Sequence, residues 1–207
     1  MLFAAVTEDV IQHDRLTQFD IVILEWFHQH NTVLGLKVFE AISFMGSPIF
    51  MLILGLIIAV ILAVRHQWIP LATWAAALLG VGLLIGVLKA VIRRPRPLYA
   101  AVFKEPQSFS FPSGHAMGSL VVYGMIAYLL AKFWAERRAM QVILFASAFI
   151  ISGAVGVSRL YLGVHYFSDI VGGYAVGSVW LATCITGLEL ERARQETFAS
   201  KENRKAR

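Results

Sequence analysis

Residues 48–64, PIFMLILGLIIAVILAV, decide the fold, because they run for seventeen positions without a charged side chain. A helix that rises 1.5 Å per residue needs about 20 mostly apolar residues to cross a hydrocarbon core of about 30 Å. Four more apolar stretches of similar length follow, at residues 70–91, 116–134, 140–157 and 168–188. The sequence therefore predicts an all-α, polytopic membrane helical bundle with about five transmembrane helices.

The composition supports this prediction. Of the 207 residues, 58% are hydrophobic and only 15% are charged, whereas soluble domains are roughly 45–50% apolar and about 25% charged. This excludes a disordered chain and argues against an ordinary soluble enzyme. The one cysteine, Cys184, excludes a disulfide scaffold. The net charge of +5 comes from basic residues that flank the apolar stretches, which indicates membrane orientation and not nucleic-acid binding.

The chain divides into three predicted parts. Residues 1–46 form an N-terminal segment in which 20–30 and 33–45 are expected to be amphipathic helices, at the membrane surface or packed on the bundle. Residues 47–190 form the membrane-embedded core, and 191–207 a charged cytoplasmic tail. The N-terminal segment also holds His13, His28 and His30, which we interpret as surface histidines and not as a metal site.

The distribution of basic residues predicts the orientation of the bundle. Five spans place the termini on opposite sides, and ten of the eighteen basic residues lie with the C-terminus. Three of the other eight (Lys89, Arg96 and Arg159) are assigned to chemistry below, which leaves ten against five. The positive-inside rule then places the C-terminus in the cytoplasm. Loops 92–115 and 158–167 would face the extracytoplasmic side of a plasma (inner) membrane.

Three polar clusters fall on that outward side. They are KAVIRRPRP at 89–97, FPSGH at 111–115 and SRLYLGVHYFSD at 158–169. Charges at membrane depth are costly, so they usually pair with one another or serve a site. We therefore expect these clusters to converge on a functional site.

The residue types favour phosphate chemistry. Lys89, Arg96 and Arg159 supply positive charge and many donors for a dianion, and Ser113 and Gly114 precede a helix start, where N–H groups favour anions. His165 and Asp169 are four apart, so on one helical turn the carboxylate could orient the imidazole. His115 remains as a proton donor for a departing oxygen. Asp169 is the only carboxylate in the clusters, which predicts a site without metal or another cofactor.

The patterns K-x6-R-P, P-S-G-H and S-R-x5-H-x3-D resemble the three signature motifs of the type 2 phosphatidic acid phosphatase superfamily. That superfamily includes membrane lipid phosphatases, glucose-6-phosphatases and vanadium haloperoxidases. All eleven fixed positions match. The resemblance implies that His165 attacks phosphorus to form a phosphohistidine, that Asp169 orients His165, and that His115 protonates the leaving oxygen. It also implies a set of residues that bind the phosphate oxygens: Lys89, Arg96, Ser113, Gly114 and Arg159.

The substrate follows less directly. An outward pocket in a membrane bundle suits a membrane lipid phosphate, and we interpret the chain as a metal-independent hydrolase of undecaprenyl pyrophosphate. The basic residues Arg93 and Arg94, which lie outside the motifs, would contact a headgroup or a second phosphate and favour that lipid. The alternative is a phosphatidic acid or phosphatidylglycerol phosphate phosphatase of broad specificity. A non-catalytic phospholipid binder or transporter is the alternative of another class, but it would not need His115, His165 and Asp169. The sequence does not specify an oligomeric state.

Overall fold

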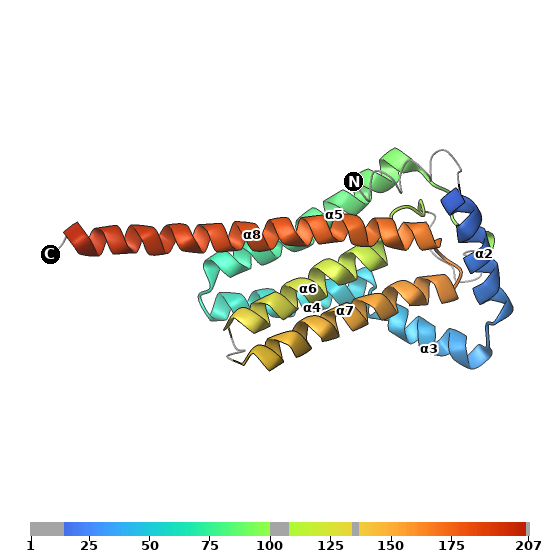
Figure 1. The fold of residues 1–207 in the computed structure, drawn as a ribbon, viewed down its shortest axis with the longest axis horizontal. Coiled ribbons are helices and arrows are strands. Elements are labelled where there is room, and N and C mark those ends of the chain that lie inside the picture. Colours follow the sequence, from blue (N-terminus) through green and yellow to red (C-terminus); the bar gives the residue numbers. More distant parts are fainter. Residues whose placement is uncertain (1–14, 100–107, 134–136, 206–207) are drawn as a thin grey trace.

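The computed structural model describes residues 15–99, 108–133 and 137–205, and the described residues form helices and connecting turns without a strand (Figure 1). The helices follow one another along the chain: α2 (Arg15–Gln29), α3 (Val33–Phe44), α4 (Pro48–Val64), α5 (Trp68–Ile92), α6 (Gly114–Phe133), α7 (Arg138–Tyr161) and α8 (Phe167–Lys205). The all-α prediction is confirmed.

Five helical stretches of the described chain are long and apolar enough to cross a membrane: Val33–Val64, Trp68–Ile92, Gly114–Phe133, Arg138–Tyr161 and Phe167–Phe198. Their number agrees with the prediction, and the chain is an integral membrane protein. The first stretch begins at Val33 and not at Pro48, because α3 is itself apolar and only the turn at 45–47 separates it from α4.

Local sequence accounts for where these helices begin. Pro48 is the first residue of α4, and the Ser47 hydroxyl accepts the N–H of Phe50 at 3.3 Å. Proline is suited to this position because its missing N–H would have no partner inside the helix. Thr32 caps α3 in the same way, accepting the N–H of Gly35 at 3.0 Å.

Helix α6 is the centre of the bundle and contacts α4, α5, α7 and α8. Its apolar side chains Met117, Val121 and Met125 are completely buried, and Trp74 of α5 packs into the same core. Helix α8 approaches α6 closely at Gly173, where an added Cβ would lie 2.8 Å from the carbonyl oxygen of Ser113. The core therefore holds the N-terminal end of α6 firmly against α8.

The N-terminal helices pack on the bundle, one of the two placements predicted for them. Helix α2 contacts α7 and α8, and α3 contacts α7. Figure 1 shows α2 lying across the end of the bundle where α8 begins. Its outer face exposes Phe19, Val22 and Trp26, whereas Asp20 and Leu24 are buried. At the opposite end, α8 continues beyond residue 190 to Lys205, so the described part of the charged tail is helical.

Candidate active site

The three motifs meet at the end of the bundle that α2 covers. One cavity of about 830 Å³ is lined there by five of the eight predicted site residues: Lys89, Arg96, Gly114, His115 and His165. They come from α5, from the segment after it, from the start of α6 and from the turn before α8. Since His115 and His165 line the same cavity, the two imidazoles are placed to act on one substrate.

His165 lies in the turn between α7 and α8, not on a helical turn shared with Asp169 as predicted, because α8 begins only at Phe167. The two side chains still meet: Nδ1 of His165 is 3.1 Å from Oδ2 of Asp169. The Ser110 hydroxyl lies 3.3 Å from the same nitrogen and donates to Oδ2 of the aspartate. With Nδ1 directed at the carboxylate, Nε2 carries the lone pair that can attack a substrate.

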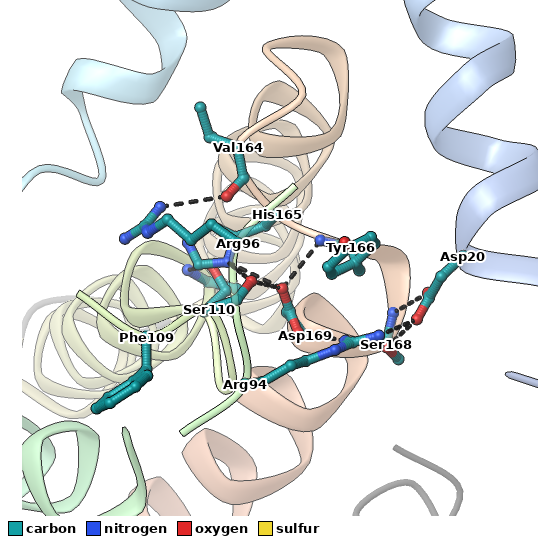
Figure 2. Close-up of polar contacts among 12 residues, drawn as sticks. Asp20, Arg94, Arg96, Phe109, Ser110, Val164, His165, Tyr166, Ser168 and Asp169 are labelled. Carbon is teal, nitrogen blue, oxygen red and sulfur yellow. Dashed lines mark hydrogen bonds and ion pairs between the residues drawn. The ribbon is translucent and has the colours of Figure 1, made fainter. Parts of the chain in front are cut away.

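Asp169 is completely buried in the first turn of α8. Its Oδ2 also accepts the N–H of Tyr166 at 2.9 Å, the reciprocal contact of a helix capping box. Its Oδ1 accepts from Nη1 of Arg94 at 2.5 Å, as Figure 2 shows. These contacts hold the carboxylate in one orientation.

The environment keeps His165 neutral. Burial, together with the charges of Arg159 and Arg96, lowers the pKa of His165 to about 4, although the contact with Asp169 opposes the shift. At neutral pH the imidazole is therefore unprotonated. An unprotonated imidazole oriented by a carboxylate has the properties of a nucleophile.

The cations are held by oxygen acceptors around the cavity. Lys89 donates to the carbonyl oxygen of Phe109, and Arg96 donates to the carbonyl and hydroxyl oxygens of Ser108 at 2.9 and 3.0 Å. Arg159 is buried, and its Nη1 donates to the Ser43 hydroxyl on α3 at 2.5 Å. Three guanidinium or ammonium groups thus gather near His165, which matches the charge of a phosphate dianion.

The start of α6 is also built into the site. Ser113 is completely buried, and its N–H donates to the carbonyl oxygen of Asp169 at 2.9 Å. Its hydroxyl lies 3.5 Å from the N–H of Ala116, at the limit of hydrogen bonding. Because Gly114 and His115 line the cavity, the positive end of the α6 dipole lies beside it.

The prediction for Arg94 is wrong. Arg94 is only 9% exposed, and its guanidinium bridges Asp169 and Asp20, so it is not available to a headgroup or a second phosphate. Arg93 is exposed, and its Nε donates to the carbonyl oxygen of Ala90. Of the two arginines that favoured a diphosphate substrate, Arg94 therefore no longer supports it.

Sequence reasoning missed Ser110, Ser168 and Asp20, which contact Asp169 directly or through Arg94 but are not fixed positions of a motif. Asp20 had a signal: it stands alone in the apolar run FDIVIL at 19–24, and a lone carboxylate among apolar residues usually has a buried partner. The two serines had none, because serine is common in turns and caps. Among the residues that the structure describes, no three histidine, cysteine or acidic side chains form a group that could hold a metal ion.

Comparison with known proteins agrees with these motifs. The model of the PAP2 superfamily matches residues 70–192. Phosphatidylglycerophosphatase B of Bacillus subtilis is 46% identical over 98 residues, which are 46% of each chain. Decaprenylphosphoryl-5-phosphoribose phosphatase of Mycobacterium tuberculosis is 31% identical over 117 residues, 55% of this chain and 57% of that protein. The chain therefore spans about half the length of these two curated relatives.

Solved structures extend the similarity to nearly the whole chain. A transmembrane PAP2-type phosphatidylglycerolphosphate phosphatase from B. subtilis matches with a TM-score of 0.82 at 30% identity, over 91% of this chain and 92% of that one. LpxE of Aquifex aeolicus, at 19% identity and a TM-score of 0.56, shares the fold. Because the family model matches more than half of the chain and includes all three motifs, the chain belongs to the PAP2 superfamily.

Proposed function

We propose that the chain hydrolyses the phosphate monoester of a membrane glycerophospholipid, with phosphatidylglycerol phosphate as the preferred substrate. The observation that supports this most directly is the composition of the cavity. Its polar end holds Lys89, Arg96 and the two histidines, and the same cavity continues between α4 and α5 past Met51, Leu56, Leu78 and other apolar residues. Its volume of about 830 Å³ lies in the range of roughly 300–1,000 Å³ typical of sites for organic ligands.

The polar end suits phosphoryl transfer in two steps. Nε2 of His165 attacks phosphorus, the phosphorus–oxygen ester bond breaks, and protonated His115 gives its proton to the departing alkoxide. Neutral His115 then takes a proton from water as the water attacks the phosphohistidine, which releases phosphate and restores both imidazoles. Lys89, Arg96 and Arg159 neutralise the charge on the phosphoryl oxygens in both steps.

The residues present favour a reaction without metal. Fixed cations already surround the site of transfer, and the acids at the site, Asp169 and Asp20, are occupied by His165, Arg94 and Ser168. Activity that survives a chelator would support this part of the proposal, and loss of activity that Mg²⁺ restores would contradict it.

The relatives favour a glycerophospholipid over our sequence-based preference for undecaprenyl pyrophosphate. Phosphatidylglycerophosphatase B shows 46% identity, whereas the undecaprenyl-diphosphatase of Sulfolobus acidocaldarius is 32% identical over 78 residues, 38% of this chain. The burial of Arg94 also removes one of the two residues that we assigned to a second phosphate. Undecaprenyl pyrophosphate stays the second candidate because of the Sulfolobus relative.

Phosphate release from a lipid panel tests the proposal. The full chain in lipid nanodiscs is given phosphatidylglycerol phosphate, phosphatidic acid, undecaprenyl pyrophosphate and glucose 6-phosphate, with His165→Ala as the inactive control. We expect the highest kcat/KM for phosphatidylglycerol phosphate and no turnover by the variant. Preference for glucose 6-phosphate, or wild-type turnover by His165→Ala, would refute the proposal.

The predicted orientation belongs to the same proposal. If the C-terminus is cytoplasmic, the cavity opens on the extracytoplasmic side, where it would receive lipids of the outer leaflet. Labelling of Arg65→Cys and Leu98→Cys, each in a Cys184→Ser background, with a membrane-impermeant reagent tests this: position 98 should react in intact cells and position 65 only after lysis.

A further inference from the structure

Helix α2 delivers a buried carboxylate to the active site from outside the part of the chain that the family model matches. Asp20 is 0% exposed, although it lies fifty residues before that part begins at residue 70. Its Oδ1 accepts the N–H of Ser168 at 2.8 Å, and its Oδ2 accepts from the Ser168 hydroxyl at 2.5 Å. Oδ2 also accepts from Nη2 of Arg94 at 2.7 Å (Figure 2).

Arg94 links Asp20 to the proposed catalytic carboxylate, Asp169. Its Nη1 donates to Oδ1 of Asp169 at 2.5 Å and to the Ser168 hydroxyl at 2.7 Å, and its guanidinium lies over the ring of Tyr166 at 4.2 Å. Burial by itself would lower the pKa of Arg94, but the carboxylates of Asp169 and Asp20 raise it above its usual value. A permanently charged guanidinium therefore lies between the carboxylates of Asp20 and Asp169, and Asp169 contacts His165 through its other oxygen.

The position of the charges indicates what Asp20 contributes. The two oxygens of Asp169 serve different partners: Oδ1 accepts from Arg94 and Oδ2 from His165. If Arg94 had only Asp169 as a carboxylate partner, its full charge would draw electron density away from the oxygen that faces the imidazole. Asp20 shares that charge, and its two bonds to Ser168 hold the first turn of α8, on which Asp169 is carried.

The same helix is attached at a second point of the site. The ring of His28, two turns along α2, stacks on Tyr99 with centroids 3.9 Å apart and an angle of 14°. Tyr99 follows Arg96 by three residues, so α2 contacts both the segment that carries a phosphate-binding cation and the start of α8. These two contacts fix the position of α2, the helix that carries Asp20.

We propose that Asp20 is a positioning residue for the reaction, which acts through Arg94 and Ser168 to keep Asp169 oriented and fully charged toward the nucleophile His165. The proposal rests on the proposed function. It gives α2 a role in turnover besides its packing on α7 and α8.

The experiment compares Asp20→Asn with Glu25→Gln in the full chain, reconstituted in nanodiscs, with dioleoyl phosphatidylglycerol phosphate as substrate. Both changes remove one negative charge from α2, but Glu25 is exposed. We expect Asp20→Asn to lower kcat by about 10- to 100-fold, which is the loss that follows when a metal-ligating side chain is deprived of the outer partner that orients it in the same way. Since Asp20 does not line the cavity, KM and the inhibition constant of inorganic phosphate should stay within about twofold. Glu25→Gln should match the wild type.

A double-mutant cycle separates positioning from a general loss of stability. If Asp20 acts through Arg94, Asp20→Asn should cost little further kcat in an Arg94→Met background, because the charge to be shared is gone. The thermal midpoint of each variant is measured alongside. If Asp20→Asn does not fold, Arg94→Lys tests the proposal instead. A single ammonium group cannot bond both carboxylates as the forked guanidinium does. The kcat of this variant should therefore fall while KM is unchanged.

Three results would overturn the proposal. The first is a wild-type kcat in Asp20→Asn or in Arg94→Lys, the second is a loss of activity that appears only in KM, and the third is additive losses of kcat in the cycle. Failure of the proposed function has a different signature. In that case the wild type releases no phosphate from any lipid, or His165→Ala remains as active as the wild type. Full activity in Asp20→Asn beside an inert His165→Ala rejects only the role of Asp20.

Discussion

Gly82 provides a direct test of whether a lipid tail occupies the apolar part of the cavity. It lines the cavity, and a Cβ added there would meet no atom within 4 Å. It also lies seven residues before Lys89 on α5, about 10 Å along the helix from the phosphate end. A leucine at this position would therefore project into open cavity and leave the packed core unchanged. The helix itself should gain stability, since glycine is about 1 kcal/mol worse than alanine in a helix interior.

The size of the effect follows from the volume that the new side chain takes. The four carbons of a leucine side chain would exclude about four methylene groups of a bound tail. At roughly 0.8 kcal/mol for each methylene kept out of an apolar site, the loss is about 3 kcal/mol, or on the order of 100-fold in kcat/KM. Gly82→Ala adds one carbon and should cost about fourfold by the same reasoning.

The assay compares dihexanoyl phosphatidic acid, kept below its micellar concentration, with tail-less glycerol 3-phosphate. The short-chain lipid is taken up from water, so the transfer energies apply to it. We expect Gly82→Leu to lose activity on the lipid and to keep it on glycerol 3-phosphate. The matched control is Gly187→Leu on α8, where an added Cβ also meets nothing within 4 Å but which does not line the cavity. If Gly82→Leu and Gly187→Leu have the same ratio of the two activities, the tail binds elsewhere.

Three further changes test the polar end of the site. Because burial lowers the pKa of His165 to about 4, its reactive neutral form persists down to about pH 5. The acid limb of the kcat/KM profile should therefore have its midpoint near pH 4. A midpoint near 6.5, the usual pKa of histidine, would contradict this. Ser110→Ala removes the hydroxyl that donates to Asp169 and should lower kcat by about tenfold in phosphate-release assays. An unchanged kcat would show that the hydroxyl is dispensable. Gly173→Ala would place a Cβ 2.8 Å from the carbonyl oxygen of Ser113. The free energy of unfolding should therefore fall by about 1–3 kcal/mol, as measured by thermal unfolding, and activity should fall with it. An unchanged thermal midpoint would show that α8 can move aside.

The membrane fold could be predicted from the sequence because its cause is local. Each span is one contiguous apolar run, and in a bilayer a helix satisfies its own backbone hydrogen bonds. The five spans could therefore be counted without knowledge of their packing. The start of the first span was missed because α3 carries Lys37 and Glu40 within an otherwise apolar stretch, which resembles a surface helix.

The residues of the motifs could also be predicted, since polar groups at membrane depth are conspicuous against an apolar background. Lys89, His115, His165 and Asp169 were all identified in this way. The prediction about local conformation was less successful: His165 precedes α8, and only the position of Asp169 in the first turn of that helix lets the two side chains meet.

The tertiary structure alone decided the surroundings of Asp169, the carboxylate beside His165. Asp20 and Arg94 are 74 positions apart and belong to no shared pattern, yet packing of α2 across the end of the bundle brings them within 2.7 Å. Hydropathy and spacing describe a helix and its neighbours along the chain, whereas a buried ion pair depends on which helix faces meet in space. For that reason Arg94 was predicted from the sequence to contact the substrate, whereas in the folded chain it forms ion pairs with Asp20 and Asp169.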